Sequence, residues 1–133
     1  MAAPAVTALV LAYPPKPLRP NARPNRYEKA AAVREYRYAC KVDALNYMRR
    51  HGIESPLPAP VELVVTFSVA AGPLPDPDNA LASFKAGIDG LVDARLLVDD
   101  NADVLKLGAP VVKRGHSSVV VVRLRSIGAG EEP

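Results

Sequence analysis

The pattern of hydrophobic and polar residues divides the chain into strands at both ends and in the middle, separated by two helices. Four segments are dense in valine and other residues that favour strands: residues 6–13, 61–70, 104–113 and 118–125. A turn at Gly115 separates the last two, so we expect them to pair as an antiparallel hairpin.

The helical segments show apolar residues at a different spacing. Residues 27–51 are predicted to form a long helix, capped by Asn25 or a neighbouring residue and stopped by Gly52. A second helix is predicted from about Asn79 to about Ala94. The apolar residues that recur at helical spacing are Tyr38, Val42, Leu45 and Met48 in the first helix, and Leu81, Phe84, Ile88 and Leu91 in the second.

The order of elements is β-α-β-α-β-β, which predicts an α+β fold. We expect a small mixed β-sheet, covered on one face by the two helices, with at least one pair of parallel neighbouring strands. The 133 residues have room for a single domain, 1–133. The proline-rich segment at about 14–26 is predicted to be an extended basic arm, and the tail at about 127–133 to be flexible.

Composition narrows the class of protein. Apolar residues make up 49% of the chain and charged residues 23%, as in globular domains. No apolar stretch is long enough to span a bilayer, and Cys40 is the single cysteine, so an internal disulfide is excluded. We therefore expect a cytoplasmic protein with no membrane partner.

The net charge is only +3, but its distribution is uneven. Ten Lys and Arg residues lie in the first fifty positions, whereas acidic residues gather between Asp76 and Asp103. A basic half beside an acidic cluster suits a protein that binds a polyanion together with divalent metal. A solvated helix face and an acidic loop would explain the same charges, and charge alone does not decide between them.

Two acidic clusters are the candidates for a catalytic or metal-binding site. Asp76 and Asp78 are separated by Pro77 and followed by Asn79, and in an extended loop two such carboxylates point to the same side and can bind one metal ion. Alternatively, Asp78 caps the second helix. The cluster of Asp99, Asp100 and Asp103 follows that helix and is either a surface turn or a second part of the same site.

Other chemistry finds little support. Neither acidic segment has the glycine and glutamate of an EF-hand calcium loop. Cys40 lies in the middle of the first helix and is expected in the core, while His51 and His116 have no evident partner. The sequence has no Walker glycine loop, Cys/His zinc spacing or Gly-x-Ser-x-Gly elbow.

An ordered set of motifs resembles the RusA family of Holliday junction resolvases, over about residues 13–122. The signature of that family runs Asp-x-Asp-Asn, then Lys, then Asp-x-Leu, then Asp-Asp. The matching stretches here are Asp76-Pro77-Asp78-Asn79, Phe84-Lys85-Ala86, Asp89-Gly90-Leu91 and Val98-Asp99-Asp100. In the arm, Pro14-Pro15 and Pro20-Asn21-Ala22-Arg23 resemble the opening of many phage-encoded members.

The resemblance implies a RusA-like homodimer that depends on Mg²⁺ (or Mn²⁺) and nicks four-way DNA junctions symmetrically in recombination and repair, often for a prophage or phage. It implies that Asp76, Asp78 and Asp100 are the catalytic metal ligands and that Lys85 is the catalytic lysine. The expected DNA contacts are phosphate contacts from the arm and the asparagine of the signature: Lys16, Arg19, Arg23, Arg26 and Asn79.

Lys85 departs from the commonest short form of the signature, because it follows the second aspartate by seven residues rather than four. At about 100° per residue, a continuous helix would leave it roughly 20° from the direction of Asp78 and one turn further along. It can then face the site if the helix begins a turn earlier, or it can pair with Asp89 at i+4.

Three kinds of function fit these observations. The chain is an endonuclease, or an architectural protein that binds branched DNA without cutting it, or an interaction domain whose aspartates only cap helices. The acidic cluster favours the endonuclease, because carboxylates repel phosphate unless a metal ion lies between them.

Overall fold

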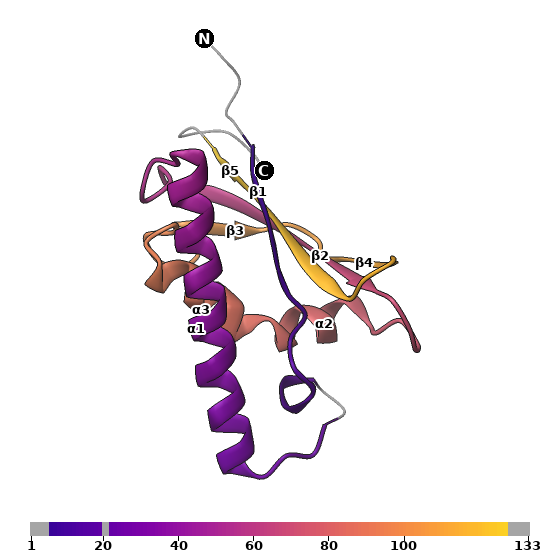
Figure 1. Cartoon of the computed structure of the whole chain (residues 1–133). Coiled ribbons are helices and arrows are strands. Elements are labelled where there is room, and N and C mark those ends of the chain that lie inside the picture. The colour runs from indigo at the N-terminus through magenta and orange to yellow at the C-terminus, as the bar shows by residue number, and fades with distance from the viewer. Residues whose placement is uncertain (1–5, 20–21, 128–133) are drawn as a thin grey trace.

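A mixed five-stranded β-sheet forms the centre of the fold (Figure 1). The computed structural model describes residues 6–19 and 22–127. The strands lie in the order β1-β5-β2-β3, and β4 also pairs with β2. Their bounds are Val6–Ala12 for β1, Val61–Val69 for β2, Leu105–Leu107 for β3, Val111–Arg114 for β4 and Val119–Ser126 for β5.

Strand β5 lies in the interior of the sheet, antiparallel to both β1 and β2, whereas β3 and β4 are parallel to β2. The predicted parallel neighbours are confirmed. The predicted hairpin of the last two strands is wrong, because β4 and β5 flank β2 on opposite sides. The valine-rich β5 is paired along both edges, while β4, with the exposed Lys113 and Arg114, takes an edge where charged side chains stay in water.

The strand predicted over residues 104–113 is two strands. Residues 108–110, which include Pro110, separate β3 from β4 and lie opposite only Val64 and Val65 of β2. The extra residue makes a bulge in this edge. Gly108 fits there because its N–H donates to the carbonyl of Leu63 at 2.9 Å, and a side chain would come within 2.9 Å of Val64.

Helix α1, Arg26–His51, confirms the predicted long helix and both of its ends. The side chain of Asn25 accepts the N–H of Glu28, and Gly52 ends the helix with a φ of 62°. The predicted buried stripe is wrong in part, because Tyr38 is 65% exposed and Leu45 38%. The buried face is instead made of mostly small residues, four apart in sequence: Ala32, Tyr36, Cys40, Ala44 and Met48.

The predicted second helix is two short helices, so three α-helices rather than two accompany the sheet. Helix α2, Pro77–Ser83, and helix α3, Lys85–Asp93, meet at Phe84, whose φ of −96° and ψ of 1° break the helix. The Phe84 ring is fully buried and packs edge-on against Phe67 of β2 and Tyr36 of α1. This aromatic contact holds the junction of the two helices against the sheet.

Helices α1 and α3 are also joined at the surface. The guanidinium of Arg37 donates two hydrogen bonds to the carboxylate of Asp93, at 2.6 and 2.9 Å. These bonds lower the pKa of Asp93 and raise that of Arg37. Beneath them, Gly90 lies so close to α1 that a side chain there would come within 2.5 Å of the carbonyl oxygen of Arg37.

The predicted extended arm and the predicted flexible tail each differ in part from the expectation. The arm contains a 3₁₀ helix, η1, Lys16–Leu18, and Leu18 packs against the core. Ile127 is buried and donates its N–H to the carbonyl of Pro60 at 2.8 Å, so a flexible tail does not begin there. Residues 20–21 of the arm and 128–133 of the tail lie outside the described residues. Within the described ranges, no helix is both long and apolar enough to cross a membrane.

The close approach at Gly90 predicts whether a Gly90→Ala substitution stabilises or destabilises the protein. In a helix with free space, Gly→Ala stabilises by about 0.5–1 kcal/mol. Here we expect Gly90→Ala to lower the free energy of unfolding by about 1–3 kcal/mol, because the new methyl group meets backbone that cannot shift freely. Urea denaturation measures the change, and a more stable variant would contradict the packing described for α1 and α3.

Candidate functional site

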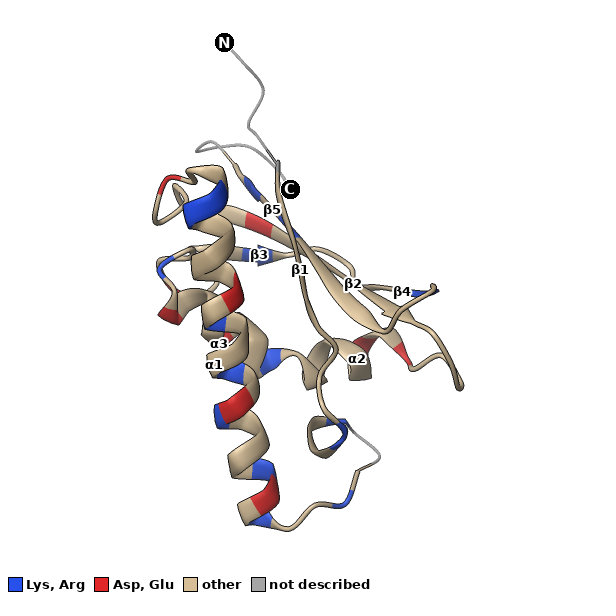
Figure 2. Ribbon diagram, in the orientation of Figure 1, with Lys and Arg blue, Asp and Glu red and all other residues tan. Residues whose placement is uncertain are grey.

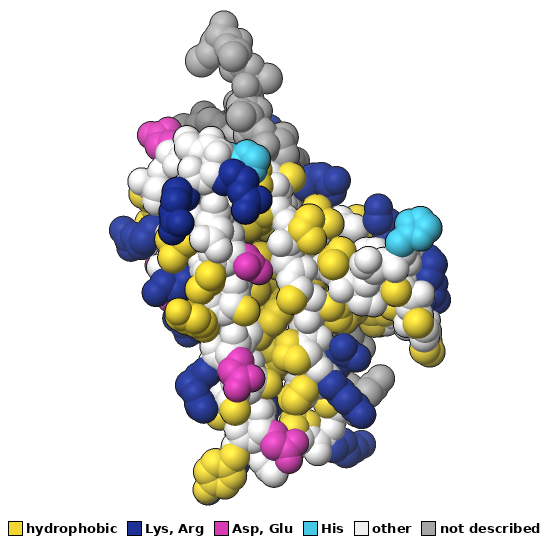
Figure 3. Space-filling model, in the orientation of Figure 1, with side chains coloured by type: hydrophobic (Ala, Val, Ile, Leu, Met, Phe, Trp, Pro, Cys, Tyr) yellow, Lys and Arg dark blue, Asp and Glu magenta, His cyan; other side chains and the backbone are white. Residues whose placement is uncertain are grey.

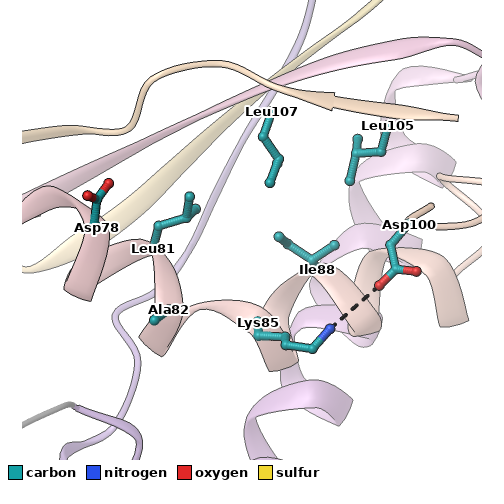
Figure 4. Close-up of a pocket in the computed structure, with 8 residues that line it drawn as sticks. All are labelled: Asp78, Leu81, Ala82, Lys85, Ile88, Asp100, Leu105 and Leu107. Carbon is teal, nitrogen blue, oxygen red and sulfur yellow. Dashed lines mark ion pairs between the residues drawn. The ribbon is translucent and has the colours of Figure 1, made fainter. Parts of the chain in front are cut away.

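A pocket of about 520 Å³ lies between α2, the start of α3, strand β3 and the loop that precedes it (Figure 4). Three charged residues line it, namely Asp78, Lys85 and Asp100. The rest of its lining is apolar and comes mainly from Leu81, Ile88, Leu105 and Leu107. Residues that are far apart in the sequence therefore meet around one cavity.

The ammonium of Lys85 lies 3.7 Å from a carboxylate oxygen of Asp100. Both side chains are accessible, at 74% and 38% exposure, so the pair is open to a ligand. Lys85 is the first residue of α3 because the helix breaks at Phe84, and the angle calculated for a continuous helix therefore does not apply. Among the ion pairs of the described residues, the partner of Lys85 is Asp100 and not Asp89.

Asp78 lies at the other end of the same pocket. Figure 4 shows its carboxylate on α2, across Leu81 and Ile88 from Asp100. The loop after α3 thus returns to the pocket that Asp78 lines, which the sequence left open, but to its opposite end. Asp78 and Asp100 are the two candidate metal ligands that line the pocket.

Asp76 has a different position. It is the N-cap of α2, and one of its carboxylate oxygens accepts the N–H groups of Asp78 and Asn79 at 2.8 and 3.2 Å. The capping role considered for Asp78 therefore belongs to Asp76. Asp78 is helical, so the expectation that an extended loop points both carboxylates to one side is wrong. In the part of the chain that is described, no three acidic, His or Cys side chains are grouped so as to hold a metal ion.

The second acidic cluster is a tight turn fixed by its own side chains. Asp99 accepts the N–H of Asp100 at 2.7 Å and the amide of Asn101 at 3.1 Å, and the bond from Asp100 is the main cause of its lowered pKa. Asn101 in turn accepts the N–H groups of Asp103 and Val104. Asp99 holds the loop, which leaves the carboxylate of Asp100 to face the pocket.

The basic residues of the arm lie around η1 and the first turns of α1 (Figure 2). Arg19 lies over the ring of Tyr13, with 5.4 Å from the guanidinium carbon to the ring centroid. Arg26 stacks on Tyr27 at 5.0 Å and donates to its hydroxyl. Lys16 and Arg23 line a shallow cavity with Glu28, which partly offsets their charge.

Two other residues with reactive or titratable side chains, Cys40 and His51, lie outside the candidate site. Cys40 is 1% exposed, and burial raises its pKa to about 12, so its thiol stays protonated at neutral pH. His51 has a partner that the sequence did not indicate, because its ring stacks on Tyr47 at 4.2 Å between centroids. Neither residue lines the pocket of Asp78 and Asp100.

Lys29 is a candidate ligand-binding residue that sequence reasoning did not single out. It lines a cavity with two of the predicted DNA-binding residues, Arg19 and Asn79. No local signal marks it among the ten basic residues of the first fifty, because its neighbours in the cavity come from the arm and from α2.

The cap made by Asp76 gives a stability prediction. We expect Asp76→Ala to lower the free energy of unfolding by about 1 kcal/mol, because the N–H groups of Asp78 and Asn79 lose their acceptor. Asp76→Asn should cost much less, since asparagine caps equally well. Urea denaturation measures the free energy of unfolding of both variants and of a control, Asp103→Ala. Equal stability of the wild type and Asp76→Ala would show that the cap is not formed.

Comparisons with known proteins find similarity in sequence to a bacterial protein. No family model matches the chain. A solved structure, that of thiamine-monophosphate kinase from Stenotrophomonas maltophilia K279a, aligns with a TM-score of 0.40 and 15% identity over 96% of this chain, which spans 32% of the kinase chain. A likeness that low carries no argument. The chain is 34% identical over 125 residues to a protein of Xylella fastidiosa (strain Temecula1), named only as an uncharacterized protein, and the match covers 90% of this chain and 76% of that protein. The chain therefore belongs to the same family as this Xylella fastidiosa protein.

Proposed function

We propose that the chain is a Mg²⁺-dependent, structure-selective endodeoxyribonuclease of the RusA type, which resolves four-way DNA junctions by paired symmetric nicks in recombination and repair. The observation that carries the proposal is the pocket lined by Asp78, Lys85 and Asp100. These are three of the four catalytic residues that the resemblance implies. A RusA-like arrangement of the fold and action in the cytoplasm belong to the same proposal.

The donor chemistry of the pocket fits a hard divalent cation in part. Asp78 and Asp100 offer carboxylate oxygens, which Mg²⁺ (or Mn²⁺) prefers, and both are exposed to solvent at the pocket. Mg²⁺ usually keeps several waters and takes only one or two protein carboxylates. Asp78 and Asp100 lie at opposite ends of the pocket, across Leu81 and Ile88, so as placed they would not share one ion. Each would instead hold an ion together with water and substrate phosphate oxygens, and Asp76 would contribute chiefly by fixing the start of α2.

When bound, Mg²⁺ would supply Lewis acidity, acidifying the attacking water and neutralising charge on the scissile phosphate. Lys85 would stabilise the negative charge that develops on the phosphate oxygens or on the leaving oxygen. Its position beside Asp100 suits both roles, because the lysine neutralises the carboxylate in the free protein and remains accessible to a substrate.

The experiment is a nicking assay on a labelled four-way junction and a matching linear duplex, with Mg²⁺ or with EDTA. We expect paired nicks in the junction only, abolished by EDTA. Asp78→Asn and Asp100→Asn should slow single-turnover nicking by more than about 100-fold, and Lys85→Ala by about 100-fold.

Asp103→Asn is the matched control, because Asp103 lies in the same turn as Asp100 but does not line the pocket. It should nick within about twofold of wild type. Tight junction binding without nicks would favour the alternative function, an architectural protein that binds branched DNA. Absence of both binding and nicking would refute the proposal.

A homodimer belongs to the proposal, because a four-way junction presents two equivalent strands to a two-fold axis. Strand β1 supports it. This strand forms one edge of the sheet, and its seven residues carry no charge or proline. The opposite edge is interrupted by a bulge and carries Lys106, Lys113 and Arg114. Uninterrupted, uncharged edges pair readily with a second copy.

The dimer prediction uses one valine on each edge. Val10 of β1 is 60% exposed and Val111 of β4 is 43% exposed. We expect Val10→Lys to convert a dimer into a monomer of 14.2 kDa, whereas Val111→Lys should remain dimeric. Light scattering coupled to size-exclusion chromatography measures the mass. A monomeric wild type, or dimers that only Val111→Lys disrupts, would contradict pairing through β1.

A further inference from the structure

A second cavity of about 290 Å³ lies on the side of α2 that faces the arm. Its lining combines three segments, namely Arg19 from the arm, Lys29 from the first turns of α1, and Asn79 and Ser83 from α2. No acidic side chain lines it. In Figure 3, dark blue side chains gather beside the end of α1 that adjoins the arm. The cavity is therefore a recess with two positive charges and an amide.

The positive charge of this recess is not neutralised within the described residues. Arg19 donates from Nε to the carbonyl of Pro14 at 3.3 Å, and its two terminal nitrogens make no hydrogen bond there. Lys29 forms no ion pair in the described part of the chain, and the Asn79 side chain makes no hydrogen bond in it. Two cations that have no acidic partner among the described residues, and an amide donor in the same cavity, suit an anionic ligand.

Arg19 is held in position by its surroundings. Its guanidinium lies over the ring of Tyr13, and Tyr13 packs edge-on against the buried Phe67 of β2. The stacking and the bond to Pro14 fix one side of the planar group and leave its terminal N–H groups to bind a ligand. A guanidinium that is already held in place binds a phosphate more tightly than a mobile one, because it loses less conformational entropy on binding.

The recess adjoins the candidate catalytic pocket. Ala82 of α2 lines both cavities, the first together with Asp78 of α2 and Lys85 of α3, and the second together with Asn79 and Ser83 of α2. A chain of phosphates that passes over Ala82 would thus meet the metal-ligand candidates on one side and the two cations on the other. A DNA strand is such a chain.

We propose that the recess of Arg19, Lys29 and Asn79 binds a backbone phosphate of the strand that is cut, next to the scissile phosphate along that strand. The inference rests on the proposed function for the identity of the ligand. It assigns to Lys29 a role in positioning DNA, and it makes this recess, rather than Lys16 or Arg23 beside Glu28, the main phosphate contact of the arm.

The test is fluorescence anisotropy of a labelled four-way junction at several salt concentrations, with EDTA so that binding is measured without cleavage. We expect Lys29→Gln and Arg19→Gln to weaken binding roughly tenfold at low salt. Each should also reduce the slope of log affinity against log salt by about one. Arg19→Lys should show an intermediate loss of affinity, because it keeps the charge but loses the planar fork.

Lys41→Gln is the matched control, a lysine to glutamine change on the same helix at a residue that does not line the recess. It should bind within about twofold of wild type. Circular dichroism verifies that each variant is folded. If Arg19→Gln is unstable, Lys29→Gln alone tests the proposal. This variant is expected to fold, because Lys29 is exposed and glutamine favours helix as lysine does.

The outcomes separate this inference from the proposed function. If the wild type nicks the junction and Lys29→Gln binds it as tightly as Lys41→Gln does, the recess is not a phosphate site. The proposed nuclease function would then stand without it. Reduced binding in Lys29→Gln, with no nicking by wild type, would support a DNA phosphate site in the recess, and would refute both the nuclease and the placement of that site next to a scissile phosphate. Inorganic phosphate that raises the melting temperature of wild type but not of Lys29→Gln, without an effect of the variant on DNA affinity, would identify a small phosphate compound as the ligand and overturn the proposal.

Discussion

The contact on which the candidate site depends is the packing of Phe84 between the sheet and α1. Its ring is fully buried and lies edge-on to Phe67 and Tyr36, at 6.2 Å between centroids in each case. At this residue the backbone leaves helical geometry, with a φ of −96° and a ψ of 1°, so α2 and α3 are separate helices whose junction is held against the sheet by the ring. The break sets Asp78 and Lys85 on separate helices whose side chains converge on one pocket.

The two cavities follow from this arrangement and from the charge of the elements around them. The pocket beside α2 and β3 is bounded at its other end by the turn of Asp99 to Asp103, so it carries two carboxylates and a lysine. The side of α2 that faces the arm meets Arg19 and Lys29, so its recess is positive. One short helix thus separates a region suited to a divalent cation from a region suited to phosphate, which is the combination that phosphodiester cleavage requires.

Sequence patterns predicted the helices and strands better than they predicted how these elements pair and pack. Asn25, Gly52 and the valine-rich strands carry local signals, so α1, β2 and β5 are found close to their predicted bounds. The position of β5 between β1 and β2 depends on long-range pairing, and the buried face of α1 depends on the close approach of Gly90. Likewise, motif order indicated Asp78, Lys85 and Asp100, but the role of Asp76 as a cap and the contribution of Lys29 depend on tertiary contacts.

The central claim is that the pocket lined by Asp78, Lys85 and Asp100 binds divalent cations, and paramagnetic broadening of amide NMR signals by Mn²⁺ tests it most directly. The account predicts that substoichiometric Mn²⁺ broadens the signals of residues around Asp78, Lys85 and Asp100 together, and that excess Mg²⁺ restores them. The signals of β1, on the far edge of the sheet from β3, should persist. Broadening confined to the turn of Asp99 to Asp103, or spread evenly over the acidic surface, would contradict metal binding by this pocket.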